Sequence, residues 1–581
     1  MRKHSLYDAI FLIDGDIDNI KLKISASKLN PKLNFLGTTL NYRNFSIKQI
    51  NNIRSEIENL EIDHLMLTLR PSAVIPKDIM NNSLLQLIFA LNVCQIYQIK
   101  KIFISKKYEN LIFDKNLFHK IENFVKILNK KVKLNKIISK KSFTFFNSLK
   151  LVKNNKFKNI EFINLEKFSS NNVKFKIYHD INTESAKFFW LGFDRNYQEV
   201  PWGKKYSKDF WYKYVNKKTT KSEIFSKINY CSRCCLPETW EGIKFDSQGI
   251  CSICKSAEDK MTIEWKNKEK ELEKIFKKYK NDDYYDCLLP ISGGKDSTFQ
   301  SFVLTKKYNL NPLAITHGQN WYSITGRKNL ENCIKQFDLD HLFFCAARKK
   351  INDVAKKSLG KIGDACWHCH IGVGTFSWQT SIDWKIRLIV FGEAPADTDA
   401  RGSFKKKEKI TPYRNIKISA IEKNNKFISK KFDLKKLSNW SYPNQRDLKE
   451  FSPEIIHLGQ FMFWDEQKNI DFVSKHFGWT NSKVENTYKG YKSNECVMAG
   501  VHDYINFLKR GIGRATVHAS DDVRRGLITR EQGFNLIREH DIKKPHAMTY
   551  YKKITGLNDK KIKRIILKAR KKSKYASKLK I

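Results

Sequence analysis

One short segment restricts the fold of this chain more than any other. The apolar run Asp286–Ile291 leads into Ser292-Gly293-Gly294-Lys295-Asp296-Ser297-Thr298, and a helical pattern follows. Glycines let the backbone turn tightly and approach an anion, and the N–H groups that open the next helix can hold phosphate oxygens. A strand, a glycine turn and a helix in this order predict a phosphate-binding loop at the carboxyl end of a parallel strand.

The side chains of this segment fit the same prediction. Ser292 and Ser297 can donate hydroxyl hydrogen bonds, with Thr298 beside them, and Lys295 adds a positive charge. Asp296 is the candidate for holding a magnesium ion on the phosphates. The segment lacks the G-x-x-x-x-G-K-[ST] pattern of the Walker A loop, so it belongs to a different class of phosphate loop.

Further apolar runs indicate the fold around this loop. They are Pro312–Thr316, His341–Cys345 and Arg387–Phe391, and helical segments separate the earlier ones. This alternation predicts an α/β domain over residues 280–400 with an open, doubly wound parallel sheet. Gly392 and Glu393 come directly after the last run, at the carboxyl end of a strand, where such sheets bind ligands.

The sequence pattern of residues 1–220 predicts an extra N-terminal α/β domain. A helical stretch, Ser83–Cys94, lies between short apolar runs, which suggests a second parallel sheet. We find no phosphate loop, paired carboxylates or metal-ligand spacing in this region, and no internal repeat anywhere in the chain. The apolar runs are Asp8–Ile13, His64–Leu69, Lys101–Ser105 and Asn159–Leu165.

The cysteines cluster in a way that indicates metal binding. Cys231-x-x-Cys234 and Cys251-x-x-Cys254 are separated by sixteen residues, a spacing typical of four-cysteine zinc sites. Four thiolates fill a tetrahedral site, so residues 229–260 are predicted to form a structural zinc knuckle. Cys235 is a spare thiol that could replace Cys234 as a ligand.

A second pair of cysteines is less informative. Cys366 and Cys369 lie in Asp364-Ala-Cys-Trp-His-Cys-His370. They could bind a second metal ion or line the active site. They could equally be buried without any chemical role, because free cysteines are commonly buried.

The remaining segments are interpreted mainly from their content of charged residues. Residues 401–455 are interpreted as a polar insertion, 456–545 as a helical region and 546–581 as a basic tail that is solvated rather than a packed helix. The net charge of +48 would attract nucleic acid, but lysine is abundant along the whole chain, so we favour compositional drift. The apolar run Ala9–Ile13 is too short for a signal peptide, and a cytoplasmic protein without membrane contact is predicted.

The motifs resemble a known family. Ser-Gly-Gly-Lys-Asp-Ser resembles the PP-loop of the N-type ATP pyrophosphatases. Together with the knuckle ahead of it, the chain resembles the N-acetyl sugar amidotransferases of the WbpG/PseA type, which act in surface polysaccharide (LPS/O-antigen), flagellin glycan and nonulosonic acid biosynthesis. The motifs that carry this resemblance are Cys231–Cys251, Cys366–Gly372, Leu388–Glu393 and Gly511–Glu531, with Ala394 standing where asparagine is expected.

The resemblance implies a reaction and its cofactors. ATP would adenylate the acetamido oxygen of an N-acetylated sugar, and ammonia would replace that oxygen to give an acetamidino sugar, with AMP and pyrophosphate as by-products. ATP, Mg²⁺ and Zn²⁺ are the implied cofactors, and a separate glutaminase similar to that of histidine biosynthesis would supply ammonia. Asp296 would hold the magnesium, and Lys295, Asp296 and Glu393 would be the catalytic residues. The residues that would bind the ATP cofactor are Ser292, Gly293, Gly294, Lys295, Asp296, Ser297, Thr298 and Gly392. Glu393 would orient the substrate or take a proton from ammonia, or be a solvated loop carboxylate.

Two other functions compete with this interpretation. A tRNA-thiolating enzyme would explain the charge and make Cys366 and Cys369 sulfur carriers or cluster ligands. A binding module could keep the loop without turnover. The Gly511–Glu531 motif argues against the first and the intact loop against the second. Within that motif, Ser520 and Asp521 are predicted to cap a helix, and Arg524, Arg525 and Arg530 to lie on a solvated face.

Overall fold

The computed structural model describes residues 6–41, 45–70, 82–105, 161–167, 227–318, 321–398, 438–443 and 445–571, with a few single positions outside these ranges. The ten strands in these residues form one sheet in the order β10-β9-β6-β7-β8-β3-β2-β1-β4-β5. Neighbouring strands are parallel except β3 and β8, which pair antiparallel. The predicted α/β class with a largely parallel sheet is confirmed.

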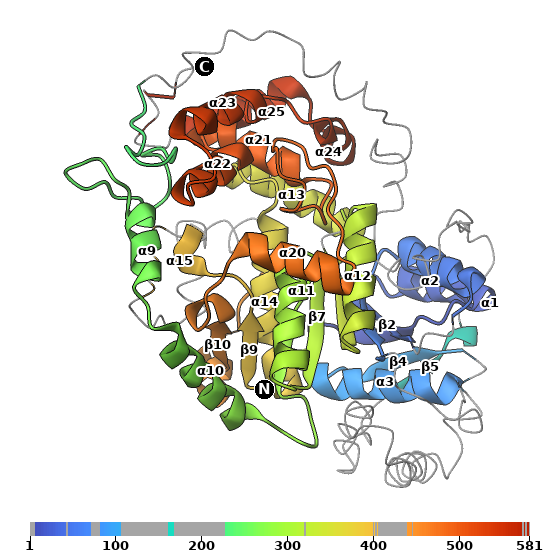
Figure 1. Ribbon diagram of the computed structural model, residues 1–581. Coiled ribbons are helices and arrows are strands. Elements are labelled where there is room, and N and C mark those ends of the chain that lie inside the picture. The colour runs from blue at the N-terminus through green and yellow to red at the C-terminus, as the bar shows by residue number, and fades with distance from the viewer. Residues whose placement is uncertain are drawn as a thin grey trace.

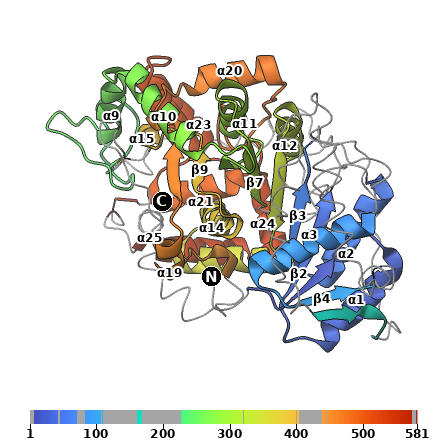
Figure 2. The same ribbon diagram turned by 90° about the horizontal axis from the view of Figure 1, so that it is seen from below.

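The central half of the sheet carries the glycine loop. Its helices lie on both faces, and in Figure 2 the strands β7 and β9 lie between α11 and α14. Every strand predicted here is present, and β10 is an additional one. The strands are β6 (Cys287–Pro290), β7 (Pro312–Gly318), β8 (Asp340–Cys345), β9 (Leu388–Phe391) and β10 (Glu454–His457), and the helices are α11 (Lys295–Phe302), α12 (Ile324–Gln336), α13 (Arg348–Ile362), α14 (Trp367–Trp384), α15 (Pro395–Thr398) and α19 (Gln445–Glu450).

The N-terminal half has the same plan. Figure 1 shows α1 and α2 on one side of its strands and α3 on the other. The four predicted strands and the predicted helix are present, and β2 is an additional strand. The elements are β1 (Ala9–Leu12), α1 (Ile17–Leu29), β2 (Phe35–Asn41), α2 (Ile47–Leu60), β3 (Asp63–Thr68), α3 (Asn82–Tyr97), β4 (Lys101–Ile104) and β5 (Glu161–Asn164).

The two halves meet at their third strands to form one continuous sheet. In β3 and β8 the antiparallel register pairs His64 with Cys345, Met66 with Phe343 and Thr68 with His341. The loops after these strands cross over. Ala347 N donates to Asp63 Oδ1 (2.9 Å), and Arg70 N donates to Asp340 Oδ1 (2.8 Å). No local pattern indicated this junction, because the paired strands are far apart along the chain.

The halves are structural repeats, so the expectation that the chain has no internal repeat is wrong. Strand order and register agree: β1 pairs with β2 from Ala9↔Phe35, and β6 with β7 from Cys287↔Pro312. The similarity was missed because few residues are identical and they are spread over sixty positions. Identical equivalent pairs include Tyr7/Tyr285, Asp8/Asp286, Gly15/Gly293, Asn34/Asn311, Thr39/Thr316, Ser46/Ser323, Asn52/Asn329, Asp63/Asp340, His64/His341 and Leu65/Leu342.

Side-chain hydrogen bonds repeat as well. Thr39 Oγ1 donates to Ile13 O (2.8 Å) and faces His64 Nε2 (2.9 Å). In the central half, Thr316 Oγ1 donates to Ile291 O (2.7 Å) and faces His341 Nε2 (2.8 Å). Tyr7 and Tyr285 each donate a hydroxyl hydrogen bond of 3.0 Å to the aspartate that opens the third strand. The repeat therefore extends to the atoms that fix the strands to one another.

The C-terminal helices gather above the carboxyl ends of the central strands (Figure 1). The basic end is not solvated as predicted, because α25 packs Ile562 and Ile566 into the core. Residues 405–437 of the predicted insertion lie outside the described residues. In the described part of the chain, no helix has the length and apolar character needed to cross a membrane. These helices are α20 (Glu466–Phe477), α21 (Ala499–Arg510), α22 (Arg514–Arg524), α23 (Arg530–His540), α24 (Ala547–Thr555) and α25 (Asp559–Lys571).

Candidate functional site

A cavity of about 520 Å³ opens at the carboxyl ends of β6, β7 and β9. This is the edge at which open parallel sheets bind ligands. Its walls are the glycine loop (residues 292–298), the segment after β9, the start of α14, and side chains between residues 464 and 525. Segments from most of the chain after residue 290 therefore enclose one space.

The glycine loop needs glycine at its centre. Gly293 has φ +83°, and a Cβ there would lie 2.5 Å from Gly326 O and 2.7 Å from Leu330 N on α12. Both the left-handed backbone and the close approach of α12 exclude a larger residue. Trp479 Nε1 donates to Gly293 O (3.0 Å) and fixes the turn from the other side.

The hydroxyl groups of the loop mainly hold the loop itself. Ser297 Oγ and Thr298 Oγ1 each donate to Gly294 O (3.0 Å), and Gly294 N donates to Ser292 Oγ (3.3 Å). Ser292 and Ser297 also line the cavity, whereas Thr298 is buried behind it. Gly294 is the N-cap of α11 and has no side chain to cap the helix, so the N–H groups of the first turn can serve a bound anion.

Lys295 lies between carboxylates. Its ammonium contacts Asp296 and also pairs with Glu466 Oε1 (2.8 Å), and Glu466 Oε2 pairs with Lys492 (2.9 Å). Burial disfavours the charged form of Lys295, but Asp296 and Glu466 outweigh it and raise the pKa of Lys295. Burial likewise opposes ionisation of Glu466, but Lys295 and Lys492 hold its pKa well below the ordinary value. Lys295 and Glu466 are therefore both charged at neutral pH.

Glu393 occupies a strained position at the end of β9. Its φ of 72° is left-handed, which is uncommon for a residue with a side chain; such strain recurs at functional sites and at helix ends. Gly459 makes room for this turn, since a Cβ there would lie 2.4 Å from Glu393 O. Gly459 N donates to that oxygen (2.9 Å), and Gly392 N donates to Gln300 Oε1 (2.8 Å).

The Glu393 side chain is exposed to the cavity, which the protein surrounds. Burial, followed by the charge of Asp296, raises the pKa of Glu393 to about 7. Such a group is partly protonated and partly ionised at neutral pH, the condition that suits a general acid or base. Glu393 is thus an exposed carboxylate, as the solvated-loop alternative expected, but the surface it is exposed on is the wall of the cavity and its pKa is raised there.

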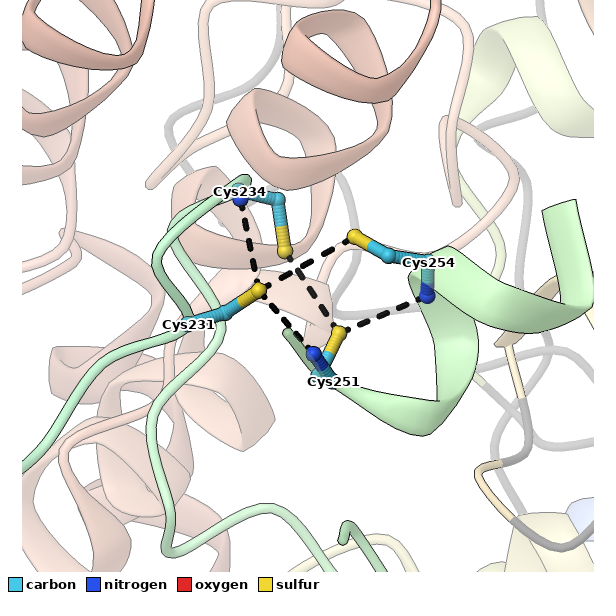
Figure 3. A group of neighbouring side chains, drawn as sticks. All are labelled: Cys231, Cys234, Cys251 and Cys254. Carbon is cyan, nitrogen blue, oxygen red and sulfur yellow. Dashed lines mark hydrogen bonds between the residues drawn. The ribbon is translucent and has the colours of Figure 1, made fainter. Parts of the chain in front are cut away.

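The four knuckle cysteines converge as predicted (Figure 3). Their sulfur atoms all lie within 4.8 Å of one another, with Cys231–Cys254 at 3.9 Å and Cys234–Cys251 at 3.8 Å. Tetrahedral zinc with Zn–S bonds of about 2.3 Å requires sulfur separations of roughly 3.8 Å, so the geometry fits zinc. Cys235 is not a fifth member, because its sulfur lies 3.6 Å from Arg530 O in a separate apolar cluster.

The knuckle is attached to two walls of the cavity. Its helix α9 (Ser252–Met261) contacts α15, where Ser256 Oγ donates to Ala396 O (3.0 Å) and Lys260 pairs with Asp397 (2.7 Å). On the other side, Arg530 Nε donates to Cys231 O and Cys234 O (3.1 Å each). The knuckle therefore links the segment after Glu393 to α22 and α23.

Several expectations for residues 511–531 are wrong. Ser520 and Asp521 do not cap a helix but lie inside α22, whose N-cap is Gly513, and Ser520 Oγ donates to Thr516 O (2.7 Å). Arg524 is not solvated: its side chain is 7% exposed, pairs with Asp521 and lines the cavity together with Arg525. Arg525 and Arg530 are exposed, as expected. Residue spacing alone could not show that Arg524, next to Arg525, is covered.

Cys366 and Cys369 line the cavity at the N-terminal end of α14, with Cys366 as the N-cap of that helix. Sequence reasoning missed Glu466, Lys492, Glu495 and Arg514, which line the same space. All four are far from the glycine loop in the sequence. Arg514 lies in the Gly511–Glu531 motif but was not singled out, and no local motif marks the other three. Burial raises the pKa of the Glu495 carboxyl, which lies beside Gly294.

Comparison with known protein families finds a match for the segment that forms one wall of this cavity. Residues 485–581 match the family model of the WbpG-like C-terminal domain of LPS biosynthesis proteins. We call this segment the WbpG-like segment. It contributes Lys492, Glu495, His502, Arg514 and Arg524 to the cavity. The part of the WbpG likeness that was expected from the Gly511–Glu531 motif is confirmed.

A second comparison reaches an archaeal protein. The chain is 24% identical over 164 residues to the uncharacterized protein MJ1599 of Methanocaldococcus jannaschii, which is 28% of this chain and 58% of that protein. The chain thus spans a little over half the length of this curated relative.

Proposed function

We propose that this chain is an ATP-dependent amidotransferase of LPS or related surface-glycan biosynthesis, which converts the acetamido group of an N-acetylated sugar into an acetamidino group. The cavity supports this proposal, because the glycine loop faces the WbpG-like segment across one enclosed space. The loop would hold the phosphates of ATP, and the WbpG-like segment would contact the substrate in the same cavity. The glycine loop is a PP-loop in this proposal.

The loop would hold ATP through backbone and ammonium groups. The first turn of α11 and Lys295 would bind phosphate oxygens, and Lys295 would exchange its carboxylate partners for phosphate. Asp296, Glu393, Glu466 and Glu495 place several carboxyl groups beside this position. Because carboxylates repel a polyphosphate, a divalent cation is needed there, and Asp296 is the residue that would hold Mg²⁺. Bound Mg²⁺ would neutralise charge on the leaving pyrophosphate.

The chemical problem is that an amide carbonyl is a poor electrophile with a poor leaving oxygen. Attack of the amide oxygen on the α-phosphorus forms an O–P bond and releases pyrophosphate. Ammonia then adds to the activated carbon, and the C–O bond to AMP breaks. Glu393, with a pKa of about 7, would take the proton that the added ammonia loses.

The arginine and lysine side chains of the WbpG-like segment favour an anionic substrate. Lys492, Arg514 and Arg524 line the cavity, and Lys492 shares its partner Glu466 with Lys295 of α11. Arginine forks match carboxylate and phosphate oxygens, so a sugar acid or a nucleotide-linked sugar fits this wall. Ammonia would come from a separate glutaminase, since we assign no glutaminase residues in this chain.

The direct test is pyrophosphate release by the purified chain with ATP, Mg²⁺ and ammonium. A panel of N-acetylated sugars, free and nucleotide-linked, is compared with bulk tRNA. We expect release that requires both a sugar and ammonium, with the sugar losing about one mass unit as O is replaced by NH. Release with tRNA alone, together with iron–sulfur absorbance, would instead support the thiolating enzyme.

A further inference from the structure

A second group of metal-binding side chains lies in the cavity wall, apart from the knuckle. The atoms of Asp364, His370 and His502 that can bind a metal all lie within 4.8 Å of one another. His502 Nδ1 is 3.5 Å from Asp364 Oδ1, and the two imidazole rings are perpendicular with centroids 4.8 Å apart. Three such side chains from two segments, about 130 positions apart in the sequence, thus point to one place.

The backbone and neighbouring side chains fix these three groups. Asp364 follows the left-handed cap Gly363 of α13, and its Oδ1 accepts from Cys366 N (2.8 Å). His370 is in the first turn of α14 and His502 in the first turn of α21. Asn506 Nδ2 donates to His502 Nε2 (2.8 Å), and Nδ1 is the atom that faces Asp364. A metal ion on Nδ1 requires Nε2–H to donate instead, which the Asn506 side-chain oxygen accepts once the amide is turned over.

The group differs from the knuckle in being open. Four cysteines fill a tetrahedral site, whereas two histidines and one carboxylate leave at least one position for water or substrate. His370 and His502 line the cavity that contains the glycine loop, so the open side faces the proposed substrate space. Two histidines with a carboxylate suit borderline divalent ions such as Zn²⁺ or Fe²⁺ rather than Mg²⁺.

We propose that Asp364, His370 and His502 bind a second divalent transition-metal ion, with an open position that faces the cavity. Metal binding stands on this geometry alone. Its role rests on the proposed function: an ion at this position would polarise the acetamido carbonyl or hold sugar hydroxyl groups while ATP is held on the opposite side.

Metal content tests the proposal independently of turnover. The full chain is stripped with a chelator, reloaded with Zn²⁺ and analysed by elemental mass spectrometry. We expect two equivalents per chain, falling to one in His370→Gln and in His502→Gln. His476→Gln, which changes an exposed histidine of α20, is the matched control and should retain both. If both site variants keep the full metal content of the parent chain, the proposal is wrong.

Cobalt substitution separates the two sites even if one variant folds poorly. Co²⁺ in the knuckle gives intense sulfur-to-cobalt charge-transfer absorption, while a site of nitrogen and oxygen ligands gives only weaker visible bands. In His370→Gln we expect the weaker bands to disappear and the charge-transfer absorption to remain. In Cys251→Ser the reverse is expected. Cobalt spectra that depend solely on the knuckle cysteines would overturn the second site.

Discussion

The two halves of the sheet share strand order, register and hydrogen bonds, yet they differ at the place where the central half bears its glycine loop. In the central half, Ser301 Oγ and Cys333 Sγ are 3.3 Å apart behind the loop. At the equivalent positions of the N-terminal half, Lys23 and Glu56 form a buried ion pair. A small neutral pair has thus been exchanged for two large charged side chains.

This exchange closes the N-terminal counterpart of the loop. Glu56 Oε2 accepts from Gly15 N (3.1 Å), the group equivalent to Gly293 N, and Lys23 donates to Leu12 O (2.7 Å). Asp14, which replaces Ser292, accepts from the Tyr108 hydroxyl (2.6 Å). A carboxylate of the protein therefore lies where a phosphate oxygen would be held, and a bound polyphosphate would be repelled. Equivalent positions of the two halves thus form a candidate anion-binding loop in the central half and a stabilising ion pair in the N-terminal half.

The largest expected difference between the halves is in catalysis. Lys295→Met removes the ammonium that would hold phosphate oxygens, and we expect pyrophosphate release to fall by about 100-fold or more. Thermal unfolding should change little, because Glu466 keeps Lys492 as a partner. Pyrophosphate release and calorimetric unfolding check the two statements. Wild-type turnover in this variant would remove Lys295 from the mechanism.

The N-terminal lysine should behave in the opposite way. Lys23→Met leaves Glu56 buried without its cation, which typically costs about 3–5 kcal/mol of unfolding free energy. Turnover per folded molecule should be unchanged. Chemical denaturation measures the loss. The variant Lys23→Ser with Glu56→Cys installs the pair of the central half and should recover most of the stability, which would not occur if the ion pair had a separate structural role.

The strained carboxylate of the central half gives a smaller, pH-dependent effect. With a pKa of about 7, Glu393 should act as a base only as pH rises through neutrality. The ratio of wild-type to Glu393→Gln activity is therefore expected to increase by about tenfold from pH 6 to pH 8. Using this ratio cancels the ionisation of ammonia, which affects both proteins alike. A ratio independent of pH would argue against proton transfer by Glu393.

The same residue makes a prediction about stability. Its folded pKa lies above the unfolded value of about 4.3, so the folded state holds the proton more tightly. The carboxyl group should therefore make the protein less stable as pH rises from about 4 to 7. Glu393→Gln is expected to unfold at a higher temperature than wild type above pH 7, with no such advantage at pH 4. Calorimetry at both pH values provides the check.

The smallest expected effects are losses of stability that should be of equal size in the two halves. Thr39→Val and Thr316→Val each remove one hydroxyl that joins the first strand to the histidine of the third. Each substitution should cost about 1 kcal/mol of unfolding free energy. Matching losses, measured by denaturation, would confirm that the two halves use this contact alike. A loss of unfolding free energy in only one variant would show that the same hydrogen-bond geometry contributes differently to stability in the two halves.

The sequence alone determined the local features of this protein. The glycine loop, the four-cysteine knuckle and eight of the ten strands follow from short-range patterns: apolar runs, glycine turns and cysteine spacing. Each depends on neighbours within about twenty residues, so it can be read directly from the chain. The likeness of residues 485–581 to the WbpG-like C-terminal domain was also visible in one local motif, Gly511–Glu531.

Only the tertiary structure decided how these features combine. The antiparallel junction of β3 with β8, the repeat, and the meeting of Lys295 with Glu466 join positions far apart in the sequence. The cavity places Glu393, Arg524 and His502 around one space in the same way. Such contacts depend on which faces of helices and strands are covered. Which faces become buried depends on how distant segments pack together, and no short segment of sequence encodes that packing.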